Sequence, residues 1–365
     1  MPSDAHDRGE SPRDEPPLSV RPPVGRIAVV VNGNAKSVSD EVIGTLDQIL
    51  DGGDLYVSKR IEDAGEIAKS LLDRGYGTIL TGGGDGTFTT VVTSVVREAE
   101  RREVPLPRFG LLRLGTGNSL AWVVGASPTA AGPRGARALS ADIARLRADA
   151  GSRPLPLVEV EGVLSPFCGF GVDANVLRDY GATKQMLARG PLRKYAPGML
   201  SYTVAALTRT LPQYLFKPTP HCRVINRGSE VRRIGKNGEA VGAPIAAGGV
   251  VYEGPATIAA VSTIPYYGFG FRMFPFAGER GDRAQLRIST VATVPFVRNF
   301  PDIWRGTYAD PERLFDYYVD DVEIEMDPPT SFQIGGDIQG ERERVRVRLA
   351  PPIPVVDFYA PPRGV

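Results

Sequence analysis

Histidine and cysteine are scarce in this sequence, and their scarcity excludes several kinds of active site. The 365 residues include two histidines and two cysteines. With only His6 and His221 available, histidine-based metal sites and Ser-His-Asp triads are close to excluded. Cys168 and Cys222 lie far apart without metal-ligand spacing, so we expect buried free thiols rather than a disulfide or a zinc site.

An excess of charge of either sign is also absent. Lys and Arg total 43 and Asp and Glu total 42, which gives a net charge of +1. The chain is 42% hydrophobic and 23% charged, as ordinary globular proteins are. This balance argues against a disordered or nucleic-acid-coating chain, and we expect no nucleic-acid partner.

The sequence has no long apolar run. Its longest uncharged stretch, Gly254–Phe271, is interrupted by proline and glycine, so it is a poor candidate for a membrane-spanning helix. Residues 1–24 are rich in Pro, Asp, Arg and Ser and lack the apolar core of a signal peptide, so we expect a disordered tail there. These features predict a cytoplasmic protein and leave peripheral contact with the inner face of the membrane open.

The first half of the chain alternates between strand-like and helix-like segments. They lie at 26–31, 39–50, 54–58, 64–74, 78–80 and 109–114. Alternation of this kind predicts a Rossmann-like parallel sheet whose ligands gather at the carboxyl ends of the strands. The polar turns at Asn32, Gly82 and Gly115 all fall at that edge.

The pattern changes after a bridge rich in Pro, Gly and Arg at 128–137 and a helix at about 140–150. From about residue 153, short strand-like runs separated by Gly and Pro predict an all-β sandwich. Because the length favours two domains, we predict a tail at 1–24, an α/β nucleotide-binding domain at 25–152 and a sandwich at 153–342.

The most specific motif is Thr81–Thr87, which reads Thr-Gly-Gly-Gly-Asp-Gly-Thr between a buried strand and a helix. Glycines in such a turn allow backbone N–H groups and the helix dipole to approach a phosphate. The carboxylate of Asp85 would repel that phosphate unless a metal ion or a transferable proton intervenes, as in magnesium-assisted phosphoryl transfer. The simpler alternative is that the glycines only permit a tight reversal of the chain. A dinucleotide-binding dehydrogenase would instead carry its glycines after the first strand, where this sequence has Asn32-Gly33-Asn34.

These residues resemble the diacylglycerol-kinase catalytic superfamily, which includes bacterial lipid kinases, sphingosine kinases and ceramide kinases. The resemblance rests on Thr81–Thr87 and Leu114–Asn118, and it continues in Phe170–Asn175 and Pro301–Thr307. It implies an ATP-binding α/β domain followed by a lipid-binding β-sandwich, with C-terminal strands at about 343–361 that return to the first domain. It also implies that ATP and Mg²⁺ occupy the cleft between these two domains. The γ-phosphate would pass to a hydroxyl of a lipid such as diacylglycerol or a sphingoid base.

The resemblance also assigns roles to individual residues. Asp85 would serve as a general base or would orient the acceptor hydroxyl. Asp173 would lie near the acceptor or the metal, with a simple turn aspartate as the alternative. Among the basic residues that follow Asp173, we select Arg193 as the cation that reaches ATP. The remaining nucleotide contacts would come from Asn32, Gly83, Gly84, Gly86, Thr87, Gly115, Thr116, Gly117 and Asn118.

One motif departs from the family pattern. The family usually carries Asp-Gly-Glu near its C-terminus, and the matching stretch here reads Gly335-Gly336-Asp337. Either Asp337 still forms a magnesium site with Asp85 and Asp173, or catalysis is weakened or lost; a register shift that brings in Glu341 is a further alternative. The rival functions are therefore a catalytically silent nucleotide- or lipid-binding protein and an enzyme like NAD kinase. The sequence lacks the Asn-Glu pair expected of an NAD kinase.

Two surface features could contact lipid. An aromatic cluster around 269–276 could line an acyl-chain pocket, although a role in the sandwich core is favoured. The arginines at 342, 344, 346 and 348 could face anionic lipid, although a solvated strand face is favoured. The sequence leaves the identity of the lipid and the oligomeric state open, a homodimer included.

Overall fold

The computed structural model describes residues 26–33, 40–50, 54–58, 63–114, 118–127, 133–147, 151–171, 174, 219–268 and 270–359. The predicted tail at 1–24 lies outside these residues. So do Gly115, Thr116, Gly117, Asp173 and Arg193 among the predicted site residues.

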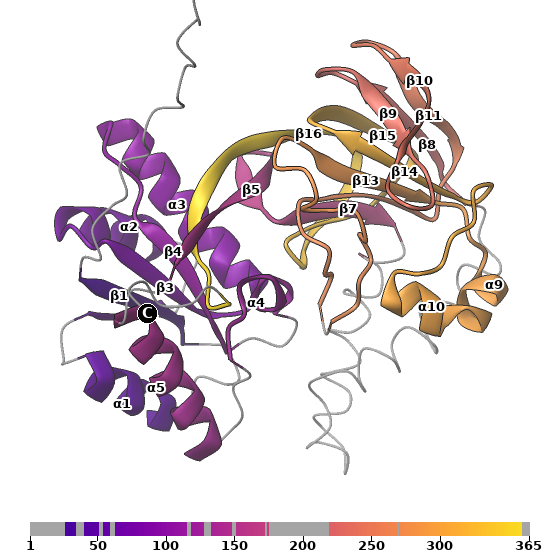
Figure 1. The fold of residues 1–365 in the computed structure, drawn as a ribbon. Coiled ribbons are helices and arrows are strands. Elements are labelled where there is room, and N and C mark those ends of the chain that lie inside the picture. Colours follow the sequence, from indigo (N-terminus) through magenta and orange to yellow (C-terminus); the bar gives the residue numbers. More distant parts are fainter. Residues whose placement is uncertain are drawn as a thin grey trace, which may run out of the picture.

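The first domain is built around a parallel sheet of four strands. The strand order is β4-β3-β1-β2, and every neighbouring pair is parallel. In Figure 1, α2 and α3 cover one face of this sheet, and α1 and α5 cover the other. Strands covered on both faces must be apolar throughout, as the buried Ala28–Val31 run in β1 is. The elements are β1 (Ile27–Asn32), α1 (Asp40–Leu50), β2 (Leu55–Ser58), α2 (Asp63–Asp73), β3 (Thr78–Gly83), α3 (Asp85–Arg102), β4 (Arg108–Arg113), α4 (Ser119–Val124) and α5 (Pro133–Arg147).

The second domain consists mainly of antiparallel strands. Two short helices, α9 (Thr293–Arg298) and α10 (Phe300–Arg305), lie at one side of it (Figure 1). Its strands are β5 (Ser152–Val160), β6 (Val163–Ser165), β7 (Phe167–Gly171), β8 (His221–Asn226), β9 (Val231–Ile234), β10 (Ala240–Ile245), β11 (Val250–Pro255), β12 (Ile258–Ser262), β13 (Ala284–Ser289), β14 (Leu314–Val319) and β15 (Asp321–Ile334). The predicted fold class, an α/β domain followed by an all-β domain, is confirmed.

A single long strand joins the two domains. β16 (Asp337–Val356) begins as the antiparallel partner of β15 and then pairs with β5. Near its end, Val355 pairs in parallel with Phe109 of β4, so the strand becomes part of the first domain's sheet. Figure 1 shows it as the yellow ribbon that arches from one domain to the other. The predicted boundary at 342/343 falls inside this strand.

Several side-chain expectations can be compared with the structure. Cys168 and Cys222 are both buried free thiols, as predicted, and burial raises the pKa of Cys222 to about 12. Met273 and Phe274 of the aromatic cluster lie in a small hydrophobic core, as favoured above. Each arginine in the β16 row pairs with a carboxylate on a neighbouring strand or turn, so the row is not a free basic strip. These pairs are Arg342–Glu161, Arg344–Glu325, Arg346–Asp321 and Arg348–Glu159.

Candidate functional site

Asp85 occupies the first position of α3, directly after the glycine-rich end of β3. Asp85 is only 8% exposed to solvent, and its carboxylate accepts two backbone hydrogen bonds. The Ser119 N–H donates to Oδ2 at 2.8 Å, and the Leu120 N–H donates to Oδ1 at 3.1 Å. Because these N–H groups belong to the first turn of α4, Asp85 caps that helix from another element and faces its positive dipole end. Asp85 therefore ties the glycine loop to the turn after β4.

The protonation of Asp85 is set by two opposing effects. Burial raises the pKa of its carboxyl group, and the hydrogen bonds from Ser119 and Leu120 lower it by a smaller amount. The net direction is upward, so the carboxyl holds a proton more tightly than it would in water. A carboxyl group with a raised pKa in this position is suited to exchange a proton with a bound hydroxyl.

Asp337 reaches the same loop from the second domain. It follows Gly335-Gly336, whose φ values of 59° and 89° form a two-residue hairpin turn between β15 and β16. Turns of this kind need left-handed backbone at both central positions, which glycine adopts without strain. The hairpin projects Asp337 onto the first turn of α3, where its carboxylate lies against Gly86.

The contact between Asp337 and Gly86 leaves no room for a side chain at position 86. A Cβ built on Gly86 would overlap Asp337 Oδ2 and would lie 3.1 Å from its Cγ. Asp337 itself remains exposed to solvent, yet the protein packed around it desolvates its carboxylate in part and raises its pKa. The nearby charge of Asp85 raises the Asp337 pKa further. The structure thus brings together two of the three carboxylates that the sequence predicts.

Asn32 and Thr87 meet beside these carboxylates. The Asn32 Nδ2 group donates to the Thr87 hydroxyl at 3.4 Å, which links the end of β1 to the first turn of α3. A Cβ on Gly83 would overlap that hydroxyl, and a Cβ on Gly82 would lie 2.6 Å from Val31 Cγ1. Both glycines are therefore required by close packing, and neither has a positive φ. Asn32, Gly82, Gly83 and Thr87 therefore lie together at the carboxyl edge of the sheet.

The turn after β4 is described only at its end. Asn118 is 4% exposed and adopts a left-handed conformation, with φ of 50°, at the position before α4. Gly115, Thr116 and Gly117 lie outside the described residues, so the structure places none of their predicted phosphate contacts. The same holds for Asp173 and Arg193.

The donor set can be tested for a magnesium ion. Among the described residues, no group of three or more His, Cys, Asp or Glu side chains is close enough to hold a metal. The Asp85 and Asp337 carboxylates nevertheless fit a hard cation, because both offer oxygen ligands and their mutual repulsion would be relieved by positive charge. Asp337 is the better ligand of the two, since both Asp85 oxygens already accept backbone hydrogen bonds.

Sequence reasoning missed two features of this site. One is the pair of N–H donors from α4, whose contact with Asp85 depends on tertiary structure and leaves no local pattern. The other is Thr89, whose buried hydroxyl has no hydrogen-bond partner in the described part of the chain. Gly335 lies next to it, because a Cβ at that position would be 2.7 Å from Thr89 Oγ1. The position where the family usually has a carboxylate thus borders an unsatisfied hydroxyl.

Together these elements define a two-domain protein in which an all-β domain sets a carboxylate against the glycine loop of an α/β domain. Comparisons with known proteins show what this chain is similar to. The sequence model of the diacylglycerol kinase catalytic domain matches residues 26–146. The resemblance to the diacylglycerol-kinase catalytic superfamily is therefore confirmed, on a match that lies within the first domain.

The chain is also similar to two curated proteins. Two proteins described as "Probable lipid kinase YegS-like", from Xanthomonas oryzae pv. oryzae strains MAFF 311018 and KACC10331 / KXO85, are each 26% identical over 190 residues. The match covers 50% of this chain and 54% of each relative, so the chain spans about half the length of the curated relatives it matches.

Two structures from Bacillus anthracis str. Sterne share the fold. One, described as a diacylglycerol kinase, has a TM-score of 0.53 at 14% identity and covers 93% of this chain and 98% of its own. The other has a TM-score of 0.60 at 13% identity, with 91% and 97% covered. At these identities the likeness concerns the fold alone.

Proposed function

We propose that this chain is an ATP- and Mg²⁺-dependent lipid kinase. It would transfer the γ-phosphate of ATP to a hydroxyl of a lipid such as diacylglycerol or a sphingoid base. The observation that carries the proposal is the position of Asp337, which the all-β domain sets against Gly86 in the glycine loop, beside Asp85. Two carboxylates at the start of a phosphate-binding helix are suited to phosphoryl transfer, in which one can bind a cation and the other can accept a proton.

The proposed mechanism relies on positioning. The backbone N–H groups at the start of α3 hold the phosphates of ATP, and Thr87 and Asn32 border them. A bound Mg²⁺ would neutralise phosphate charge, with Asp337 as its ligand. Asp85 uses a remaining oxygen lone pair to accept the proton of the lipid hydroxyl, and the α4 N–H groups fix the orientation of its carboxylate. Gly115, Thr116, Gly117, Asp173 and Arg193 are carried into this proposal by the resemblance alone.

A specific observation favours the rival function, a silent nucleotide- or lipid-binding protein. Gly335 stands where the family usually has a carboxylate, and Asp85 already accepts hydrogen bonds on both oxygens. A protein that only binds nucleotide could use Asp85 purely as a helix cap. No observation among the described residues favours the enzyme like NAD kinase.

One pair of measurements separates the two functions. Radiolabelled ATP and Mg²⁺ are incubated with the protein and a total lipid extract, and the lipids are resolved by chromatography. In parallel, calorimetry measures the binding of ATP with Mg²⁺. Labelled lipid that disappears in the Asp85→Ala variant supports the kinase. Binding of ATP without labelled lipid supports the silent nucleotide-binding protein. The absence of ATP binding contradicts the kinase and leaves only a silent lipid-binding protein.

We also propose that the chain contacts the membrane peripherally through α9 and α10. Val294, Val297 and Phe300 are 69%, 49% and 41% exposed on these helices. Arg298 lies next to Val297 and has no ion pair within the described residues. Exposed apolar side chains beside a cation suit the interface of an anionic bilayer. Among the described residues, no helix is long and apolar enough to cross a membrane.

Vesicle sedimentation tests this surface. We expect the double variant Val294→Asp and Val297→Asp to bind vesicles that contain anionic phospholipid several-fold more weakly than the parent protein. Val250→Asp, which changes a 39% exposed valine on β11, serves as the matched control and should bind normally. Equal losses in the two variants would contradict a role for α9 and α10. A homodimer remains a prediction.

A further inference from the structure

A cavity of about 350 Å³ lies where α4, β5 and the segment between β12 and β13 meet. Its walls are mixed, with slightly more apolar than polar surface, and Trp122 and Tyr266 lie together in its lining, with ring centroids 6.0 Å apart. The lining residues are Trp122, Val123, Arg153, Leu155, Ile264 and Tyr266, together with prolines, small residues and Thr263. Arg153 is the only charged residue among them.

Part of the Arg153 side chain is buried without a partner among the described residues. Its Nε atom is buried without a hydrogen bond, and no ion pair joins its guanidinium to any of the described residues. Its backbone is fixed, because Arg153 pairs with Val355 between β5 and β16. A buried donor without a partner is unfavourable, and the planar fork of arginine matches the oxygens of a carboxylate or phosphate.

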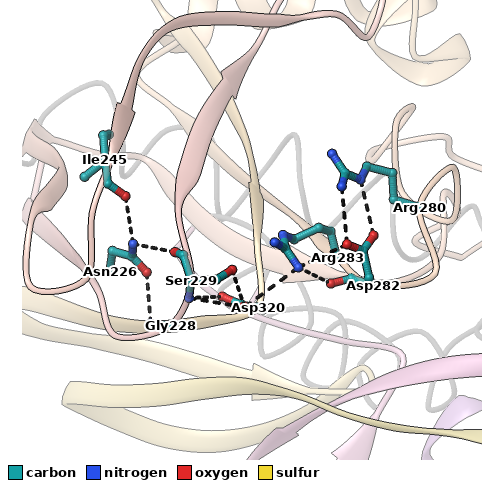
Figure 2. Close-up of polar contacts among 8 residues, drawn as sticks. All are labelled: Asn226, Gly228, Ser229, Ile245, Arg280, Asp282, Arg283 and Asp320. Atoms are coloured by element: carbon teal, nitrogen blue, oxygen red, sulfur yellow. Dashed lines mark hydrogen bonds and ion pairs between the residues drawn. The ribbon is translucent and has the colours of Figure 1, made fainter.

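Among the described residues, no acidic side chain lines the cavity. A second cation, Arg113, lies with its guanidinium carbon 4.7 Å from the centre of the Trp122 ring. The two acidic side chains of the bordering segment between β12 and β13, Glu279 and Asp282, already have partners. Figure 2 shows Asp282 between Arg280 and Arg283. Glu279 accepts a hydrogen bond from the Tyr318 hydroxyl at 3.0 Å.

We propose that this cavity binds an anionic amphiphile, with its oxyanion head on Arg153 and its apolar chain against Trp122, Leu155, Ile264 and Tyr266. The positive head site and the apolar walls together select a ligand that carries both features. A phosphomonoester on an apolar chain has this chemistry, and it is also the class of product that a lipid kinase releases. Only this link to a product rests on the proposed function; the binding site itself rests on the cavity and Arg153.

Intrinsic fluorescence provides a direct assay, because the chain has two tryptophans and one of them lines the cavity. In a Trp304→Phe background, Trp122 is the single reporter. The protein is titrated with octyl phosphate below its micelle concentration, and with octanoate, inorganic phosphate and octanol. We expect saturable changes with octyl phosphate and octanoate, and at least tenfold weaker binding of inorganic phosphate and octanol. Binding of inorganic phosphate as tight as that of octyl phosphate would mean that the chain is not recognised and would overturn the proposal.

Two variants test the site, one by removing its cation and the other by filling its open space. Arg153→Met should weaken octyl phosphate at least tenfold and leave octanol unchanged. Gly281→Leu should block both ligands, since Gly281 lines the cavity and a Cβ added there meets nothing within 4 Å, so the new side chain can enter the space. Arg232→Met removes an exposed arginine of β9 and is the control for net charge, with binding unchanged. If Arg153→Met does not fold, Gly281→Leu still decides the question. Normal binding in Gly281→Leu overturns the proposal. The fluorescence assay needs neither ATP nor turnover. A lack of kinase activity can therefore be distinguished from a lack of ligand binding in the cavity.

Discussion

Gly86→Ala offers a test in which activity should fall without a loss of stability. The new Cβ would overlap Asp337 Oδ2, so the carboxylate must withdraw from the start of α3. A displacement of about 1 Å at a reacting centre can lower turnover by roughly 100-fold. The same change replaces glycine within a helix, where alanine is favoured by about 0.8–1 kcal/mol. We therefore expect a loss of lipid phosphorylation of about 100-fold, with a free energy of unfolding that is unchanged or slightly higher.

The assay pairs radiolabelled phosphate transfer with denaturant unfolding. Gly65→Ala is the matched control, because Gly65 lies in the first turn of α2 and a Cβ there meets nothing within 4 Å. That control should gain a similar stability and keep full turnover. If Gly86→Ala turns over lipid at the parental rate, Asp337 does not act from the position seen in the structure, and the reasoning is refuted.

Three further predictions concern the carboxylates and the hairpin turn. Asp85→Ala removes the cap of α4, so we expect a loss of about 1–2 kcal/mol in denaturant unfolding together with loss of lipid phosphorylation; near-normal turnover would contradict the assigned role. Gly335→Asp places a side chain at φ of 59°, 2.7 Å from Thr89 Oγ1, so the melting temperature should fall, with a left-handed penalty of about 1–2 kcal/mol. Turnover should equal or exceed the parental rate, because the new carboxylate can accept from the Thr89 hydroxyl, and a collapse of turnover would mean that the motif is misaligned. Asp337→Asn removes a carboxyl whose pKa is raised by burial and by Asp85. A raised carboxyl pKa destabilises the folded state above that pKa and has no effect below the unfolded value of about 3.9. The variant should therefore be the more stable protein at pH 7, with a difference that shrinks toward pH 4 in thermal melts; a difference that grows on acidification would contradict this sign.

The sequence was sufficient for the fold class because the relevant signals are local. Apolar runs such as Ala28–Val31, separated by amphipathic segments, specify buried parallel strands with covering helices. Short runs between Gly and Pro specify the antiparallel strands that follow. The structure also places Asp337 against the glycine loop, and the sequence analysis had linked Asp337 to Asp85 only through the family resemblance. Spacing alone does not bring residue 337 to residue 86.

Contacts between residues that are far apart in the sequence could not be predicted in this way. The hydrogen bonds from Ser119 and Leu120 to Asp85 join two helices that are separated by β4, and no periodicity encodes them. The arginines of β16 look like a basic strip in the sequence because their partners lie on other segments; Arg346, for example, pairs with Asp321. Partner choice across a sheet depends on strand register, which becomes visible only in the folded chain.

The glycines of the loop show how a packing explanation and a functional one can be separated. Gly82 and Gly83 are small because Val31 and Thr87 pack against them, and both neighbours belong to the same domain. Those two positions are explained by the tight meeting of β1, β3 and α3, with no ligand required. Gly86 differs, because the group that excludes a side chain is the carboxylate of Asp337, which arrives from the all-β domain. Packing alone does not explain an exposed carboxylate beside Gly86, because the raised pKa of Asp337 means that its charge is unfavourable at that position. The contact between Gly86 and Asp337 therefore needs a functional explanation. Comparing the turnover of Gly86→Ala with that of Gly65→Ala tests that explanation.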